Sequence, residues 1–460
     1  MILLCNLDII VIVLFFLLVL VVGFIPKYTK DKDDYLLSGR KVGLLLFILT
    51  NVSTWYGGIL GIGEFTYNYG LLSWFTQGLP YYIFAIVFAI TMAPKISKSS
   101  LTTIPEKINE QYGKKTSLLS SIIVFILVSP APYLLMLANI ITLILGIKLI
   151  YALILSAIIS SVYLFKGGYK SDLYTDAFEF FVMFIGFGLL FGYAYLKNGD
   201  LGYLIKSLPP EHLNPFSKVS IGYIIVWFLI ALWTFADPGF HQRCNAAKNG
   251  NVAKYGIIIS VLFWFLFDFL TNVSGLYSKL ALPNLQNPVM AFPLLAENVL
   301  PNGVKGIFYA ALFATVLSTL NSFLFLSATT FGNDIIPKLI KIEQNNIAKY
   351  TRYGLVLSLL ISIILANNIN SVIDLWYYIG SICIPPLIIV IISSYYIKYK
   401  VNYKYVVIEI IASLSGGIIW FILRKSGVSW GMISLIEPMI VGLLFAIIIH
   451  VYALVSKKTP

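Results

Sequence analysis

Long runs of apolar residues recur along the whole chain, and short polar stretches separate them. Runs of about 20 apolar residues match the length that an α-helix needs to cross a lipid bilayer. The pattern predicts an all-α polytopic membrane protein of about thirteen transmembrane helices, with no soluble domain between them. The predicted spans are 6–24, 42–67, 72–93, 117–145, 148–165, 175–196, 219–236, 255–281, 304–330, 352–367, 371–397, 404–423 and 431–455.

The composition agrees with a membrane protein and excludes other classes. Of the 460 residues, 59% are hydrophobic and 11% are charged, whereas charged residues make up roughly a quarter of a soluble chain. The net charge of +12 comes from lysines spread over many loops, so it indicates no nucleic-acid partner. The three cysteines are far apart and form no metal or disulfide motif. Because no Ser/His/Asp set or metal-ligand set converges, we do not expect an enzyme.

The basic residues also predict the orientation of the chain in the cell membrane. Most of the 32 Lys and Arg residues fall in alternate loops, among them the stretch that holds Arg243. Loops rich in Lys and Arg stay in the cytoplasm. The distribution therefore places the N-terminus outside and the C-terminus inside. The largest outer loop, 282–303, is expected to hold a short re-entrant or surface helix.

The apolar run at 304–330 carries a cluster of hydroxyl side chains, namely Thr315, Ser318, Thr319 and Ser322. Their helical spacing gathers the oxygen atoms on one side of the helix. Inside a membrane such groups need a partner or line a cavity. Hard cations such as Na⁺ take oxygen ligands, so the cluster is a candidate ion site. The alternative is that each hydroxyl bonds to its own helix or joins two helices.

Two spans contain residues that interrupt a helix. The span at 42–67 holds four glycines within seven residues, Gly57, Gly58, Gly61 and Gly63. They predict a break that frees backbone carbonyls, although close helix packing is the alternative. The span at 219–236 runs into Asp237-Pro238-Gly239, which predicts either a second break or a plain helix end. Each interruption begins a run of five spans, and an odd number gives the two runs opposite orientations. Paired interruptions of this kind indicate a binding site at mid-membrane.

Three acidic residues, Asp172, Asp176 and Glu179, share a helix face at the start of the sixth span. A carboxylate inside the membrane costs about 2.5 to 3.5 kcal/mol. We expect Asp172 at the interface near the helix N-terminus, where negative charge is favoured. Asp176 lies one turn deeper and is the better candidate to meet a cation, with an interfacial cap as the alternative.

Five motifs in this order resemble the sodium/solute symporter family, which includes sodium-coupled sugar, proline, pantothenate and sialic acid carriers. The motifs are YLLSGRKVG (35–43), GIGEFTYNYG (61–70), GGYKSDLYTDAFE (167–179), FHQRCNAAKN (240–249) and ALFATVLSTLNSFLFLSATTFGNDI (311–335). The resemblance implies Na⁺-coupled symport of a small organic solute across the bilayer by alternating access. It also implies two inverted repeats, 42–196 and 219–397, joined by an outer loop, 197–218. An extra helix with its cytoplasmic loop (1–41) precedes them, and two helices (398–460) follow.

The resemblance further implies the residues that bind the ions. The conserved sodium site matches the hydroxyls of Ser318 and Thr319 and the carbonyl of Thr315. The two remaining ligands are carbonyls of the broken helix, near Leu49 and Val52. A second cation site of some members matches Asp176 and Ser322. Two departures from the family pattern, Glu179 in place of a glutamine and Asn321 in place of a hydroxyl residue, put the second Na⁺ in doubt.

For the solute, the implied site lies between Asn51, Ser53, Tyr56, Glu64 and Trp233. Tyr56 stands where sugar carriers have a glutamine, and Trp233 stands at their aromatic gate. These departures argue against a sugar. Two alternatives stay open: a proton-coupled carrier on the same fold, using Asp176, Glu179 or Glu64, and a membrane sensor that binds without transport.

Overall fold

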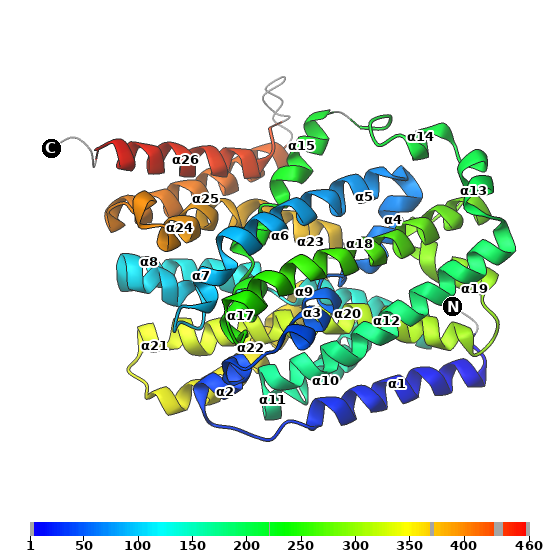
Figure 1. The fold of residues 1–460 in the computed structure, drawn as a ribbon, viewed down its shortest axis with the longest axis horizontal. Coiled ribbons are helices and arrows are strands. Elements are labelled where there is room, and N and C mark those ends of the chain that lie inside the picture. Colours follow the sequence, from blue (N-terminus) through cyan, green and yellow to red (C-terminus); the bar gives the residue numbers. More distant parts are fainter. Residues whose placement is uncertain (1–3, 220, 369–371, 427–435, 457–460) are drawn as a thin grey trace.

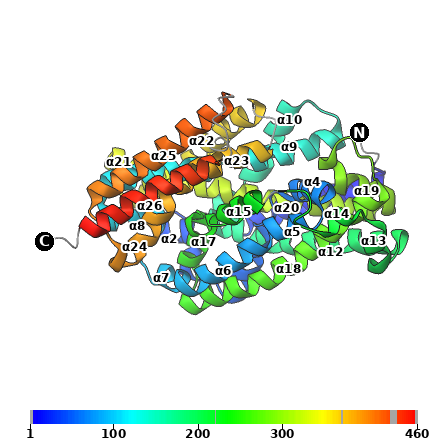
Figure 2. The same cartoon turned by 90° about the horizontal axis from the view of Figure 1, so that it is seen from above.

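The computed structural model describes residues 4–219, 221–368, 372–426 and 436–456, and its regular elements in these ranges are helices. The long helices lie side by side along the longest axis of the molecule (Figure 1). Helix α1 begins at one end of this bundle, and α26 ends at the opposite end (Figures 1 and 2). The prediction of an all-α polytopic membrane protein is therefore confirmed.

Eleven helical segments of the described chain are long and apolar enough to cross a membrane, and a bent pair of helices makes twelve. The eleven are Asn6–Phe24 (α1), Leu72–Thr91 (α5, α6), Ile104–Leu145 (α8, α9), Leu149–Gly167 (α10, α11), Tyr169–Asn198 (α12), Ile221–Ala246 (α15, α16, α17), Gly250–Ala281 (α18), Val304–Leu339 (α20, η3, α21), Gln344–Asn368 (η4, α22), Tyr403–Lys425 (α25) and Pro438–Ser456 (α26). The bent pair, α23 (Val372–Cys383) and α24 (Pro385–Tyr395), turns by 48°.

The described chain has one span fewer than the thirteen predicted, and the missing one is the predicted span 42–67. This stretch forms two short helices, α3 (Leu44–Ser53) and α4 (Ile59–Tyr69), and neither is long enough to count as a span. The predicted starts at 371 and 431 lie outside the described residues. Every predicted span thus has a helical counterpart, and in the stretch 42–67 that counterpart is two short helices.

Short helices close both ends of the bundle. They are α2 (Lys32–Leu37), η1 (Ser38–Arg40), α7 (Ala93–Ser97), α13 (Leu201–Ser207), α14 (Pro210–Leu213), η2 (Pro288–Met290), α19 (Ala291–Val299) and η5 (Ile397–Tyr399). Helices α2 and α7 lie at the end where α26 finishes, and α13, α14 and α19 lie at the other (Figures 1 and 2). Helix α19 is the short helix expected in the loop 282–303.

Helix α20 (Val304–Thr329) forms the centre of the bundle. Nearly all of its side chains are buried, including its hydroxyl residues. A helix of this kind needs neighbours all around it. Its closest neighbour is α12, where a methyl group added at Gly186 would lie 2.2 Å from Cβ of Ala311. The missing side chain of Gly186 therefore lets the two helix backbones approach closely.

The start of α20 is held by a carboxylate from α1. The Oδ1 atom of Asp8, whose side chain is fully buried, accepts hydrogen bonds from the backbone N–H groups of Gly303 (2.7 Å) and Gly306 (2.8 Å). Its Oδ2 atom accepts one from the N–H of Cys5 (3.1 Å). Negative charge is favourable at a helix N-terminus, where the first N–H groups lack partners within the helix.

We expect Asp8→Asn to destabilise the protein by about 1.5 to 3 kcal/mol, the usual worth of hydrogen bonds to a charged group. The amide has one acceptor oxygen in place of two and carries no charge. The measurement is the melting temperature of the purified protein. Glu343→Gln is the control, because Glu343 is exposed and makes no side-chain hydrogen bond or ion pair in the described part of the chain. Equal melting temperatures for the two variants would contradict this role of Asp8.

Candidate ion-binding site

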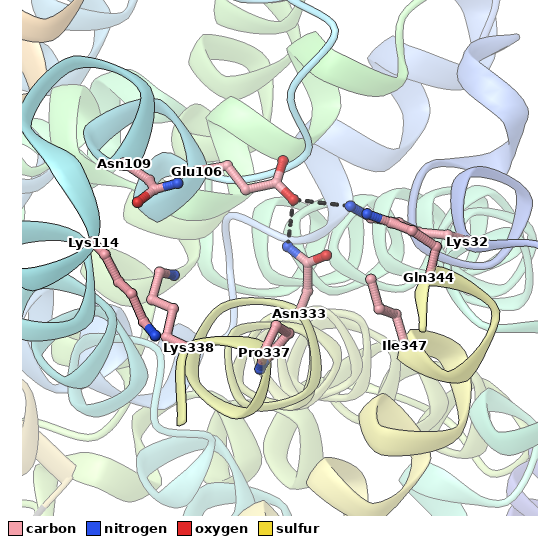
Figure 3. Close-up of a pocket in the computed structure, with 9 residues that line it drawn as sticks. All are labelled: Lys32, Glu106, Asn109, Lys114, Asn333, Pro337, Lys338, Gln344 and Ile347. Atoms are coloured by element: carbon pink, nitrogen blue, oxygen red, sulfur yellow. Dashed lines mark hydrogen bonds and ion pairs between the residues drawn. The ribbon is translucent and has the colours of Figure 1, made fainter. Parts of the chain in front are cut away.

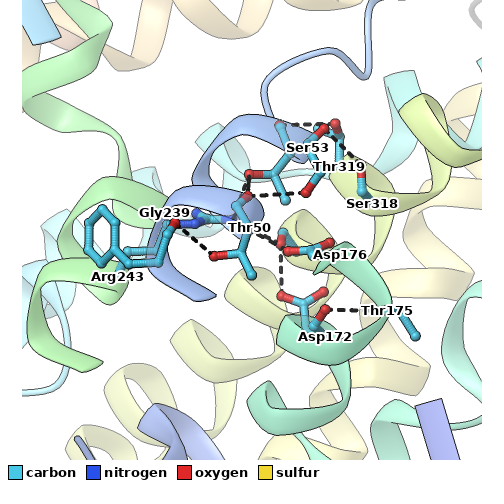
Figure 4. A network of polar contacts seen from close by, with 12 residues as sticks. Thr50, Ser53, Asp172, Thr175, Asp176, Gly239, Arg243, Ser318 and Thr319 are labelled. Carbon is cyan, nitrogen blue, oxygen red and sulfur yellow. Dashed lines mark hydrogen bonds and ion pairs between the residues drawn. The ribbon is translucent and has the colours of Figure 1, made fainter. Parts of the chain in front are cut away.

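The predicted break in the stretch 42–67 is present. Helix α3 ends at Ser53, α4 begins at Ile59, and the residues between them are not helical. A helix end leaves backbone carbonyls without partners, and no water satisfies them inside a bilayer. Two hydroxyls of α20 donate to them instead. Ser318 Oγ bonds to the carbonyl of Ser53 (2.9 Å), and Thr319 Oγ1 bonds to that of Thr54 (3.0 Å; Figure 4).

The same hydroxyls also reach back to their own helix. Ser318 Oγ and Thr319 Oγ1 each lie 3.3 Å from the carbonyl oxygen of Thr315. Two hydroxyl oxygens and three carbonyl oxygens therefore meet at one buried place. Sets of oxygen atoms without nitrogen or sulfur suit hard cations.

The structure brings together three of the residues expected at the sodium site, Thr315, Ser318 and Thr319. The carbonyls that meet their hydroxyls belong to Ser53 and Thr54. In the described part of the chain, no hydrogen bond joins these hydroxyls to Leu49 or Val52, both of which lie earlier on α3. The carbonyl of Val52 instead accepts from the N–H of Trp55 (3.2 Å) within the turn that ends α3.

Two glycines allow the break to pack closely against its neighbouring helices. A methyl group added at Gly57 would lie 2.5 Å from Cβ of Thr319, and one at Gly58 would lie 2.1 Å from the ring of Trp376 on α23. Such distances are too short for any side chain. These glycines therefore do more than interrupt the helix. Gly57 lets the break approach α20 closely, and Gly58 lets it approach α23.

The second interruption is present as well. Helix α15 (Ile221–Ile230) is followed by a short turn, then by α16 (Trp233–Ala236) and α17 (Pro238–Ala246). Between α16 and α17, Asp237 is extended, and its side chain accepts from the N–H groups of Gly239 (2.6 Å) and Phe240 (3.3 Å). Asp237 therefore caps the new helix, and the interruption is a break followed by further helix.

Arg243 was expected in a loop between spans, but it lies in helix α17, so its placement in a loop is wrong. Its side chain is 95% buried, and its Nη2 atom donates to Thr54 Oγ1 at 2.6 Å. The same atom lies 3.4 Å from Ser322 Oγ, 3.5 Å from the carbonyl of Thr50 and 3.9 Å from Asp176 Oδ2. Figure 4 shows this guanidinium between the first break and the acidic residues. It joins both broken helices to α20 and α12.

Asp176 and Ser322, the candidate second cation site, both contact Arg243. Ser322 Oγ donates to Asp172 Oδ2 at 2.8 Å, so this hydroxyl bonds to a different carboxylate than the expected one. Asp172 was placed at the membrane interface, but its side chain is fully buried within the bundle. The carboxylates of Asp176 and Glu179 are also fully buried and accept no hydrogen bond in the described part of the chain.

The five residues expected to bind the solute point to different neighbours. Tyr56 donates to the carbonyl of Trp264 on α18 (2.9 Å), and the ring of Trp233 packs over Gly380 of α23. Asn51 and Ser53 are buried on α3, whereas Glu64 is only partly buried on α4. No hydrogen bond joins any two of these side chains within the described ranges.

Sequence reasoning missed another buried carboxylate near the first break. Asp268 on α18 accepts a hydrogen bond from the hydroxyl of Tyr82, and only 7% of its surface is exposed. Trp264, whose carbonyl binds Tyr56, lies one turn earlier on the same helix face. The signal was available, because Asp268 is the single acidic residue in the apolar run 255–281.

Comparison with known proteins identifies the class. The family model described as the sodium:solute symporter family matches residues 35–404, and the chain therefore belongs to this family. It is 25% identical over 395 residues to the rabbit (Oryctolagus cuniculus) sodium/glucose cotransporter 1, covering 73% of this chain and 59% of that protein. It is also 26% identical over 440 residues to a sodium/glucose cotransporter of Vibrio parahaemolyticus, covering 84% and 78%. These are transporters, as the sequence predicted, and not enzymes.

Solved structures agree on the fold. A Na⁺-coupled sialic acid symporter in a substrate-bound outward-open state superposes with a TM-score of 0.82 over 98% of both chains, at 16% identity. A nucleobase-cation-symport-1 family transporter in a closed conformation gives 0.64 over 93% of this chain and 95% of that one, at 13% identity. The fold is thus that of these transporters.

We expect Gly57→Ala to lower the melting temperature, because the added methyl group must push the break away from Thr319. Gly61→Ala is the matched control on the same segment, since its methyl group would lie 3.6 Å from Trp376, an ordinary contact. Thermal unfolding of both purified variants checks this. A Gly57→Ala protein as stable as Gly61→Ala would show that the break does not lie against α20.

Proposed function

We propose that this protein is a secondary active transporter that couples Na⁺ entry to the uptake of a small organic solute by alternating access. One observation supports this above all: five buried oxygen atoms meet where α20 crosses the broken helix. The family to which the chain belongs supports Na⁺ as the coupling ion.

In this proposal, Na⁺ lies between α20 and the break, and the hydroxyl groups keep their hydrogen atoms but turn them away from the ion. The hydroxyl oxygens of Ser318 and Thr319 and the carbonyl of Thr315 serve as ligands from α20. Carbonyls of the broken helix complete the set. Those of Ser53 and Thr54 accept the hydrogen bonds of these hydroxyls in this structure, and those of Leu49 and Val52 follow from the family resemblance.

The bound ion would couple to the solute through the break itself. Na⁺ would tie the end of α3 to α20, and the same unwound segment would form one wall of the solute site with Asn51, Tyr56, Glu64 and Trp233. Any gain in solute affinity that Na⁺ produces must be matched by an equal gain in Na⁺ affinity that the solute produces. The departures at Tyr56 and Trp233 argue for a solute other than a sugar.

The proposed topology follows the same scheme. Residues 42–196 and 219–397 would form the two inverted repeats, each starting with a broken helix, and the site would lie between them at mid-membrane. The N-terminus would face outward and the C-terminus the cytoplasm. The lysine-rich end of the bundle near α2, α8 and α21 would then face the cytoplasm.

We expect the double variant Ser318→Ala/Thr319→Ala to lose the stabilisation that Na⁺ gives the purified protein. The variant removes two Na⁺ ligands at once. It should therefore also lose the gain in solute affinity that Na⁺ gives, which for coupled ligands is typically about 1 to 3 kcal/mol, or roughly 5- to 150-fold. The measurement is the melting temperature in NaCl against N-methylglucamine chloride, followed by Na⁺-driven uptake in proteoliposomes. Amino acids, carboxylates, vitamins and sugars form the solute panel.

Ser327→Ala is the matched control for this experiment. Ser327 is a buried hydroxyl on the same helix, and it bonds to Ser358 on α22 at 2.8 Å, away from the break. Its loss should leave the response to Na⁺ unchanged. Full Na⁺-dependent uptake in the double alanine variant would remove the basis of the proposed site.

A proton-coupled carrier is the second candidate, and the acidic cluster is the observation that favours it. The carboxylates of Asp172, Asp176 and Glu179 are fully buried, and in the described chain their one ion pair joins Asp176 to Arg243. Buried carboxylates without partners are costly when ionised. The cluster therefore requires further positive charge, and either Na⁺ or protons would supply it.

We expect an inward Na⁺ gradient to drive uptake, and an inward proton gradient without Na⁺ to drive none. Proteoliposomes loaded with alkaline buffer and diluted into acidic, Na⁺-free buffer test this directly. Uptake under these conditions that disappears in Glu179→Gln would overturn Na⁺ coupling and assign the proton to this cluster.

A further inference from the structure

A cavity of about 330 Å³ lies at the end of the bundle where α2, α8, α21 and α22 meet. None of the residues that line it belongs to the proposed ion or solute site, so the transport mechanism uses none of its side chains. Figure 3 shows that Lys114 and Lys338 line the cavity from one side, whereas Lys32 enters from the other. Asn109 of α8 and Gln344 of η4 add amide groups to the walls.

Among the described residues that line the cavity, Glu106 is the only acidic one, and its hydrogen-bonding capacity is largely used. Oε1 accepts from Lys32 Nζ and from Asn333 Nδ2, both at 2.9 Å. Oε2 accepts from the backbone N–H of Thr102 at 2.6 Å. Glu106 is therefore paired with Lys32 and forms no ion pair with Lys114 or Lys338 in the described part of the chain.

Lys114 and Lys338 take part in no ion pair in the described part of the chain. Lys338 Nζ donates to neutral groups, the carbonyl of Asp334 (2.5 Å) and Ser121 Oγ (3.3 Å). Lys114 has no hydrogen-bond partner in the described ranges. Oδ1 of the buried Asp334 carboxylate accepts from Thr103 Oγ1 (2.7 Å) and Asn333 Nδ2 (3.0 Å), and its Oδ2 has no hydrogen-bond partner in the described part of the chain. Two like charges thus share one cavity, which is unfavourable unless an anion lies between them.

Both walls of the cavity depart from regular helix at these lysines. Gly113, directly before Lys114, has φ 83° and ψ 173° and divides α8 into two parts. The segment Thr330–Ile335, shortly before Lys338, is a π-helix. Irregular turns of this kind are frequent at functional sites. The two irregular turns therefore place Lys114 and Lys338 next to departures from regular helix.

We propose that this cavity binds a phosphate group, held by Lys114 and Lys338 with Lys32 at its far side. Lysine ammonium groups bind phosphate as mobile point charges, and amide N–H groups complete the hydrogen bonds. The phosphate belongs either to a free anion or to the headgroup of an anionic lipid, because basic pockets between membrane helices hold both. Bound there, it ties α2, which leads into the broken helix, to α8 and α21.

The test compares melting temperatures of the purified full chain. One arm titrates inorganic phosphate against chloride at equal ionic strength. The other compares nanodiscs of phosphatidylglycerol with nanodiscs of phosphatidylcholine. The variant Lys114→Gln/Lys338→Gln removes the two lysine charges of the cavity that take part in no ion pair in the described part of the chain. Lys115→Gln/Lys341→Gln is the control of equal charge, because both of these lysines are exposed and neither lines the cavity.

We expect phosphate or phosphatidylglycerol to raise the melting temperature of the wild type and the control. The double glutamine variant should lose this shift, and Lys114→Arg/Lys338→Arg, which keeps both charges, should retain it. A shift in the first arm assigns a free phosphate, and one in the second arm alone assigns a lipid headgroup. No shift in either arm, or an equal shift in the double glutamine variant, would overturn the proposal.

Discussion

The rest of this structure depends on how a membrane-embedded chain satisfies the backbone carbonyls of a broken helix. Without water, each unpaired carbonyl costs several kcal/mol, so a break persists only where another segment supplies donors. Helix α20 supplies them through Ser318 and Thr319, which lie 265 residues from their partners Ser53 and Thr54. The break is therefore tied to the centre of the bundle, and the hydroxyls that stabilise it are also the oxygens that suit a cation.

Charge in the interior follows a related rule. Arg243 brings one positive charge into a region with three buried carboxylates, and it contacts Thr54, Ser322 and Asp176 from a helix that itself starts at a break. A guanidinium with several partners links elements more specifically than a single hydrogen bond. Both interrupted helices meet at this one side chain, so a movement of either break alters the surroundings of the acidic residues.

The two ends of the bundle differ in how they are closed. At the end where α1 begins, the fully buried carboxylate of Asp8 caps the N-terminus of α20. At the other end, near α2 and α21, lysines gather around a cavity that Glu106 neutralises only in part. At the first end, the Asp8 carboxylate has its hydrogen-bond partners. At the second end, the cavity holds more lysines than carboxylates, which favours the binding of an anion.

The sequence by itself determined the helical spans, the break at Gly57 and Gly58, the interruption at Pro238 and the hydroxyl group on α20. These features depend on local properties, namely the length of apolar runs, backbone freedom and helical spacing. Only the tertiary structure decided which carbonyls the hydroxyls meet. It also placed Arg243 in the core, although the polar stretch around this residue predicts a loop. Burial of the guanidinium is possible because a buried partner, Asp176, compensates its charge. Contacts of this kind depend on the rotation and packing of helices far apart in the chain, and local patterns do not encode them.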